Sequence, residues 1–363
     1  MGFEMTRKTR RQVRLGIESL EKREVPATFK VMGVAELVSA VAAVANTSGP
    51  NTILLAPGTY RVGGLQAVNA KDLTIEGNTS KGTVSIVGDR TNRVFEVDGG
   101  SVTFSGLNIS GGGGVSQGGG INAVNADVTL KSTSVTGNTA TTAGGGIAAI
   151  GGALNIVSSS IKGNSVAGGS TELFGGGIAD QNGTLNISKS AIEDNIIASG
   201  SNAMFGGGIA ALNTPVSLSH TTLSGNGALF IGQSPRGAAT GGAIFEQGST
   251  LRITNSVLAQ NQINVAIRGT AAASSGGAAT TVGTNVTVNG GSVTGNTLNA
   301  VSAQGESNLG SAFSTLGGSL NITGTTFNGN TPKSLKNVFD HPGATVVLQN
   351  LTFNGKKVGK TLS

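Results

Sequence analysis

Two carboxylic acids at the same offset of a repeated segment are the best candidates for catalysis. Asp180 and Glu246 stand two residues after the Ile of a Gly-Gly-Gly-Ile and a Gly-Gly-Ala-Ile motif, where most repeats have a small or apolar residue. If the repeats stack like β-strands, the two acids lie roughly 9.6 Å apart. This is near the upper limit for the acid and base of an inverting glycosidase. The alternative is that both are ordinary polar residues at a strand end.

Other side chains that carry chemistry are scattered. His341 has the same offset three repeats later, at roughly 14 Å by strand spacing, which is too far to join the two acids. Arg236 and Arg268 are candidate ligand-binding residues in successive long spacers, but their offsets differ. Sugar lyases need clustered acids and a base, and the long spacers contain few acids. The sequence therefore favours a protein without catalytic activity over a polysaccharide lyase or glycoside hydrolase.

Two aromatic residues form a second candidate site. Phe174 and Phe205 occupy the same position in adjacent repeats, just before the glycine run. Stacked phenylalanines would anchor the base of each spacer to the core, and the alternative is a platform for sugar rings.

No metal or cofactor site is predicted. The chain has no Cys, which excludes thiolate ligands and disulfides. Glu193 and Asp194 are adjacent, but a solvated turn explains them better than a metal site. Neither a Ca²⁺-binding glycine-aspartate nonapeptide nor a GxxxxGK[ST] phosphate loop occurs. We expect no cofactor.

These residues belong to an 18-residue frame that repeats nine times. Its origins are spaced 26 to 35 residues apart, and all length variation lies in the spacers between frames. Each frame has apolar residues at the origin and 7, 9 and 14 positions later, and the seven middle frames end in Asn. The origins are Phe95, Ile121, Ile147, Ile178, Ile209, Ile244, Ala279, Phe313 and Phe339. A fixed frame with variable spacers is typical of a solenoid.

The frame predicts an all-β fold. Apolar residues alternate with Ser, Thr, Asn or Lys, which indicates short strands with one buried face. Three such strands per coil, each paired with its copies in neighbouring coils, give a right-handed parallel β-helix. We expect the Asn column to close the third strand, because Asn tolerates left-handed backbone and its amide can bond adjacent coils. Spacers should project from one edge as loops.

The two ends differ from the body. We divide the chain into a basic leader (1–28), a cap (29–50) with a short helix over 34–44, the β-helix (51–356) and a tail (357–363). The net charge is +6, and residues 1–24 alone carry seven Lys or Arg against four Glu. The body is therefore nearly neutral, which argues against nucleic-acid binding. No stretch of 18 apolar residues predicts a membrane span.

The chain has three resemblances to known families. Residues 18–28, ESLEKREVPAT, resemble the leader of extracellular planctomycete-type proteins, which implies export. The helix followed by ILLAPGTY (53–60) is similar to the entry of pectate-lyase-like β-helices. GGAIF (241–245) and FNGN (327–330) resemble the GGA[ILV] and FxxN repeats of polymorphic outer-membrane adhesins, although most frames here have Ile, Leu or Val at the Phe position.

Together these features predict an extracellular or cell-surface β-helix with a structural or adhesive role. A surface or extracellular polysaccharide is the expected partner, bound through the spacers on one edge. The alternative is a polysaccharide-active enzyme. The sequence leaves the ligand, the export route and the oligomeric state open.

Overall fold

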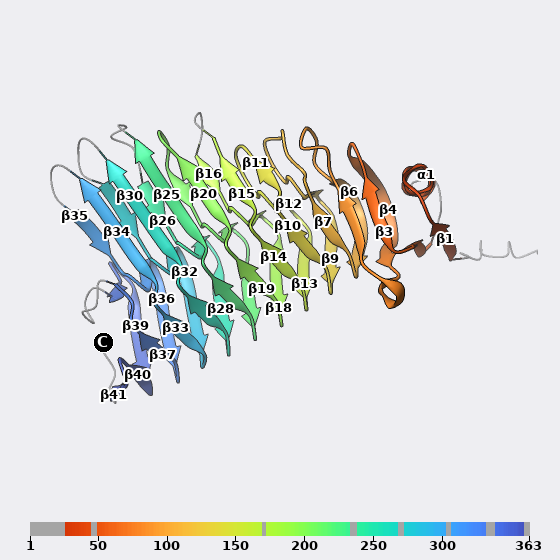
Figure 1. Ribbon diagram of the computed structural model, residues 1–363. Helices are drawn as coiled ribbons and strands as arrows, with labels where there is room; N and C mark the ends of the chain where they lie inside the picture. The colour runs from red at the N-terminus through yellow and green to blue at the C-terminus, as the bar shows by residue number, and fades with distance from the viewer. Residues whose placement is uncertain are drawn as a thin grey trace, which may run out of the picture.

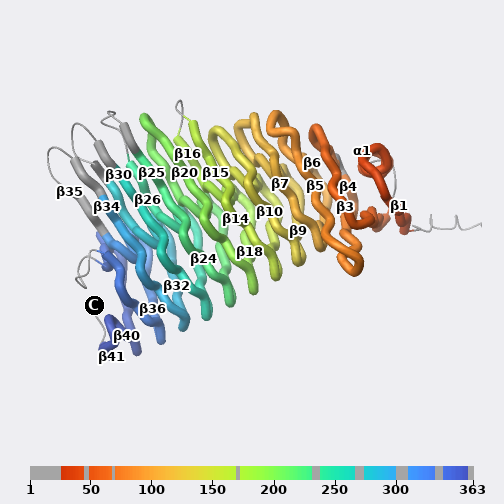
Figure 2. The backbone as a smooth tube through the Cα atoms, viewed as in Figure 1, coloured from red at the N-terminus to blue at the C-terminus, as the bar shows by residue number. Residues whose placement is uncertain are grey.

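The protein is a parallel β-helix, as the repeat predicts. The computed structural model describes residues 26–44, 49–168, 172–232, 238–267, 272–302, 306–331 and 338–358. Short strands stack side by side into an elongated body, with helix α1 near one end and the C-terminal strands at the other (Figure 1). The backbone tube winds through successive similar turns (Figure 2). Among the described strands, each pairs in parallel with its copy in the next coil, apart from one terminal strand.

The first and second strands of every coil merge into one sheet of 18 described strands, the first sheet. Four of its strands bend through both positions: β4 (Leu65–Gly77), β6 (Phe95–Ser105), β32 (Ala279–Asn289) and β36 (Phe313–Thr323). The first position is also filled by β8 (Ile121–Val124), β12 (Ile147–Ile150), β17 (Ile178–Gln181), β22 (Ile209–Leu212), β27 (Ile244–Gln247) and β38 (Phe339–Asp340). The second is filled by β1 (Ala27–Val31), β2 (Asn51–Leu55), β9 (Asp127–Lys131), β13 (Ala153–Val157), β18 (Thr184–Ser188), β23 (Val216–Ser219), β28 (Thr250–Thr254) and β39 (Thr345–Gln349).

The third strand of each coil belongs to a second sheet of 12 described strands. They are β3 (Gly58–Arg61), β5 (Val84–Val87), β7 (Asn108–Ser110), β10 (Ser134–Thr136), β14 (Ser160–Lys162), β19 (Ala191–Glu193), β24 (Thr222–Ser224), β29 (Val257–Ala259), β33 (Ser292–Thr294), β37 (Thr326–Asn328), β40 (Leu351–Phe353) and β41 (Lys356–Val358). A 3₁₀ turn, η1 (Thr79–Lys81), precedes β5.

The described parts of the spacers from Thr139 onward are largely strands, so the prediction of loops and of three strands per coil is incomplete. From Thr139 onward they form two further parallel sheets, the spacer sheets. One contains β11 (Thr139–Ala140), β15 (Ser165–Ala167), β20 (Ile196–Ser199), β25 (Gly227–Gly232), β30 (Gln262–Ile267) and β34 (Thr297–Ser302). The other contains β16 (Leu173–Phe174), β21 (Met204–Phe205), β26 (Ala238–Thr240), β31 (Ala272–Ser275) and β35 (Glu306–Leu309).

The spacer sheets have a small core of their own, separate from the main one. Val166, Ile197, Met204, Phe230 and Ile263 are all fully buried within it. Spacers of unequal length still bring apolar residues into register, because each extra strand pairs with the equivalent strand of the next coil. The spacer strands therefore enlarge one edge of the solenoid and also stabilise it.

The main core follows the frame. Origin residues pair in register along the axis, such as Ile147 with Ile178 and Ile178 with Ile209, and none of these three side chains is accessible. Burying an aliphatic side chain contributes about 1.5–3 kcal/mol relative to exposure. The lumen is therefore a packed interior.

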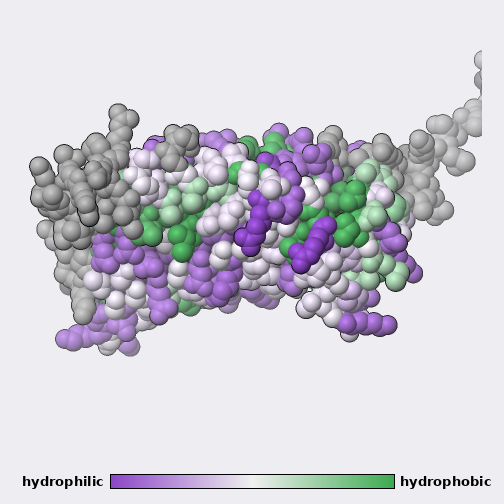
Figure 3. Space-filling view, turned by 45° about the horizontal axis from the view of Figure 1, so that its top comes forward, coloured by the Kyte–Doolittle hydropathy of each residue, from purple (hydrophilic) through white to green (hydrophobic). Residues whose placement is uncertain are grey.

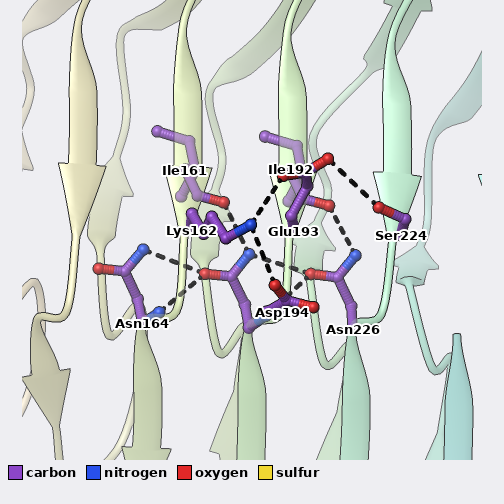
Figure 4. Close-up of polar contacts among 9 residues, drawn as sticks. Ile161, Lys162, Asn164, Ile192, Glu193, Asp194, Ser224 and Asn226 are labelled. Atoms are coloured by element: carbon purple, nitrogen blue, oxygen red, sulfur yellow. Dashed lines mark hydrogen bonds and ion pairs between the residues drawn. The ribbon is translucent and has the colours of Figure 1, made fainter.

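The predicted Asn column is a continuous hydrogen-bond ladder (Figure 4). The Oδ1 atom of Asn226 accepts from the backbone N–H of Asn195 at 3.2 Å and from its Nδ2 at 3.0 Å. The Nδ2 of Asn195 also donates to the carbonyl oxygen of Ile161 at 2.9 Å. The same pattern runs through Asn138, Asn164, Asn195, Asn226, Asn261, Asn296 and Asn330.

Both ends differ from the domain boundaries drawn from sequence. β1 starts at Ala27, within the expected leader, and pairs in register with β2. The predicted helix is α1 (Val34–Val44), which buries Leu37, Ala40, Val41 and Val44. At the other end, β41 lies antiparallel to β40, so part of the expected tail continues the second sheet. The rest of the leader and tail, 1–25 and 359–363, lie outside the described residues.

Candidate functional site

Both candidate acids point into the lumen. Asp180 pairs with Ala211, and Ala211 pairs with Glu246, so the acids are two coils apart with a small residue between them. Alternation along β17 and β27 places them on the same face as the buried origin residues. Only 3% of Asp180 and 0% of Glu246 is accessible. The structure thus keeps the predicted spacing but puts the acids where no polysaccharide reaches them.

Each acid is paired with a threonine from the next coil. Thr214 Oγ1 lies 3.2 Å from Asp180 Oδ1, and Thr284 Oγ1 contacts Glu246 Oε2. The other oxygen of each carboxyl is buried without a partner among the described atoms. A threonine occurs five residues after a frame origin only in the two frames that follow an acid. That correlation is the signal in the sequence from which the two carboxyl–threonine pairs can be predicted.

Burial raises the pKa of both carboxyls. Desolvation is the largest cause for each, and it raises the pKa of Asp180 and of Glu246 to about 7 despite the opposing hydrogen bonds from Thr214 and Thr284. Thr214 Oγ1 also lies 3.1 Å from the carbonyl oxygen of Leu212. A protonated Asp180 can therefore donate to Thr214 while that hydroxyl donates to Leu212, which leaves Asp180 Oδ2 as the unpaired atom of this pair among the described atoms.

The remaining charged candidates do not assemble around these acids. His341 is exposed beyond the end of β38, while Arg236 and Arg268 lie outside the described residues. No group of three His, Asp or Glu with metal-binding geometry occurs in the described part of the chain. Lys162 bonds Glu193 Oε2 at 3.3 Å and Asp194 Oδ2 at 3.2 Å (Figure 4), so the adjacent acids form an exposed ion-pair cluster.

The two predicted aromatic residues do stack. The ring centroids of Phe174 and Phe205 are 5.0 Å apart with an angle of 14° between the planes. Phe205 also packs against Phe245, at 4.8 Å and 52°. Phe174 and Phe205 are half-buried, whereas Phe245 is buried. The stack therefore covers the junction between the first sheet and the spacer sheets.

Next to this stack is a cleft of about 300 Å³. Its floor is formed by three alanines on the outer face of β12, β17 and β22, which belong to one axial column, here called the floor column: Asn122, Ala148, Ala179, Ala210 and Phe245. One side belongs to a second column, the wall column: Gln117, Ala143, Phe174, Phe205 and Thr240. The other side is lined by the column of Ile150, Gln181 and Leu212.

The cleft exists because small residues coincide in both columns. Phe205 covers one face of the Phe174 ring, but the neighbour on the other side is Ala143, whose methyl group is too small to cover it. Above Ala179 the space is therefore open, whereas Ala148 and Ala210 on either side are only 2% and 1% accessible, and the uncovered face of Phe174 lines the opening. One coil beyond Ala210, Phe245 fills the equivalent position.

The polar groups of the cleft are neutral. Gln117, Thr142 and Gln181 line it, and their side chains make no hydrogen bond within the described structure. Asp180 is the one ionisable residue among the described residues of the lining. It lines the cleft with its backbone, because its carboxyl bonds Thr214 on the opposite face of the strand. The sequence signal for the floor column is an alanine one residue after three successive origins.

The view from the spacer edge shows hydrophobic patches interspersed with weakly polar surface along the described body (Figure 3). Exposed apolar side chains of the spacer strands include Ile196 and Leu229. No helix among the described residues is long and apolar enough to cross a bilayer.

Comparison with known proteins adds little. No protein-family model and no curated protein matches the sequence. Among solved structures, one from Geobacillus virus E2, described as ORF18, is similar at 13% identity and a TM-score of 0.40. The match covers 89% of this chain and 59% of the viral chain. This likeness is too weak to carry an argument about function.

Proposed function

We propose that this protein is a non-enzymatic, extracellular or cell-surface β-helix with a structural or adhesive role, which binds glycan at the spacer edge. The observation that carries the proposal is the cleft between Phe174 and Gln117. Ligand sites are typically concave and mainly apolar, with a few polar groups that orient the ligand. An uncovered aromatic face beside free amide and hydroxyl groups suits a pyranose ring, which has an apolar C–H face and a polar rim.

The architecture supports a structural role. Each coil contacts mainly its neighbours, so stability is distributed along the axis and long bodies remain rigid. The Asn ladder extends through seven coils and ties successive turns together. The resemblance of residues 18–28 to an export leader, and of the repeats to adhesin repeats, supports a surface location.

The enzymatic alternative has one observation in its favour. A pKa near 7 suits a general acid, and both Asp180 and Glu246 have pKa values raised to about 7. A general acid must also reach the glycosidic oxygen. Both carboxyls instead face the lumen and bond a threonine of the next coil, which favours a structural role.

Glycan binding is tested with immobilised plant, bacterial and animal glycans, comparing wild type with Phe174→Leu. Leucine keeps the apolar volume but removes the aromatic face, so binding should weaken roughly two- to tenfold. Phe353→Leu is the matched control, because Phe353 is also half-buried but lies in the last coil. Circular dichroism of each variant verifies the fold.

The same panel decides between the two functions. Release of reducing or unsaturated ends from any polymer, lost in Asp180→Asn with Glu246→Gln, would establish an enzyme and refute the proposal. Failure of wild type to bind any glycan would refute glycan adhesion.

A further inference from the structure

Resting on the proposed glycan-binding function, we infer that the cleft holds a single neutral sugar residue, at the end or on a branch of a glycan. Three features support this inference: the limits of the cleft along the axis, the width of the slot beside Phe174, and an unpaired amide oxygen at Asn122.

The cleft is closed at both ends along the axis. Ala179 leaves the floor open between the buried Ala148 and Ala210, and the floor column is filled by Phe245 on one side and by Asn122 on the other. A polymer lying along the axis would need a groove that continues past both residues. A closed site of about 300 Å³ instead accommodates the end or a side branch of a chain.

The gap between Gln117 and Phe174, here called the slot, has the width of one sugar ring. Gln117 and Phe174 flank Ala143 in the wall column, so they lie two coil spacings apart, about 9.6 Å. After the half-thickness of the aromatic ring and of the amide is subtracted, one saturated ring fits between them. Its C–H face would pack on Phe174, and its hydroxyls would meet Gln117 and Thr142.

Asn122 supplies a buried acceptor at the closed end. Its Nδ2 donates to Glu96 Oε1 at 2.8 Å, which fixes the orientation of the amide. Its Oδ1 therefore has no donor among the described groups, although only 6% of the residue is accessible. Asn122 adjoins Ala148 in the floor column but does not itself line the cleft, so a ligand hydroxyl supplies the missing donor only by entering between Gln117 and Ala148.

The charge of the site excludes acidic sugars. Among the described residues, no Lys, Arg or His lines the cleft. The nearest charged side chains around Asn122 are Glu96 and Arg93, which pair with each other. A uronate carboxylate would lose water without gaining a cation, and it would present a second acceptor to Asn122.

The test uses ligand-observed NMR with matched pairs of methyl glycosides and methyl uronides of glucose, galactose and mannose. Wild type should bind at least one neutral glycoside, with the corresponding uronide at least about tenfold weaker. Ala143→Phe should abolish binding by filling the slot, and the fold accepts Phe in this column at 174 and 205. Asn122→Ala should weaken binding roughly three- to tenfold, whereas the exposed control Asn186→Ala should not.

The outcomes distinguish the site for a single neutral sugar from the proposed glycan-binding function. If a uronide binds as tightly as its neutral partner and Ala143→Phe abolishes both, the neutral class is wrong while glycan binding stands. If wild type binds only long polymers, the single-residue site is wrong. If no sugar or polymer binds, or a peptide occupies the cleft instead, the proposed function fails as well.

Discussion

Replacing Asp180 with Asn should stabilise the protein at neutral and alkaline pH and leave it nearly unchanged in acid. The carboxyl is 3% accessible, and desolvation raises its pKa from 3.8 to about 7. Asparagine has a similar shape and never ionises, so it removes the cost of burying a charge while it can still bond Thr214.

The sign and size of this change in stability follow from the linkage between proton binding and folding. Below the unfolded pKa both states hold the proton, so stability does not depend on this group. As pH rises, the unfolded chain releases its proton first, and stability falls until the folded carboxyl ionises at about pH 7. At 1.36 kcal/mol per pKa unit, the loss for Asp180 is about 4 kcal/mol. Glu246→Gln should change stability in the same direction, because its pKa is raised from 4.5 to about 7.

The measurement is urea unfolding from about pH 4 to about pH 9, approached from both the folded and the unfolded protein. The stability difference between Asp180→Asn and wild type should grow through this range and level off above about pH 7. Asp98→Asn, at an exposed position, controls for loss of a carboxyl. A difference that stays constant with pH would refute the assignment of a buried, protonated Asp180.

Three further changes test the scaffold. Asn226→Ala should lower the free energy of unfolding in urea by about 3 kcal/mol or more, because buried donors of the ladder lose their acceptor. The exposed control, Asn186→Ala, should have little effect. Equal effects of the two changes would contradict the role of the ladder. Gly176→Ala should lower the free energy of unfolding by a similar amount, because the new Cβ would lie 2.4 Å from a carbonyl oxygen of the next coil. Its control, Gly33→Ala, should be tolerated, because the space around Gly33 is open. Lys162→Ala should lower stability only slightly, and less still at high salt, because half of that side chain is exposed. A large, salt-independent loss would argue against a surface ion pair.

The sequence alone determined the solenoid, its core and the Asn column. Ile178 and Ile209 recur at one offset, and a column of like residues buries its side chains only if coils stack in register. The helix over 34–44 was predictable for the same reason, because apolar spacing reports one buried face. Periodicity also identified Phe174 and Phe205 as neighbours.

Only the tertiary structure decided which face each candidate occupies and what the spacers become. Asp180 faces the lumen and Ala179 faces the cleft. Because neighbouring residues of a strand face opposite sides, a change of one position in the frame decides whether a side chain is buried or lines the cleft. The spacer strands differ in length and lack a shared frame, so only pairing between coils reveals them. The cleft itself arises where small residues in two separate columns coincide, and such a coincidence exists in space rather than along the chain.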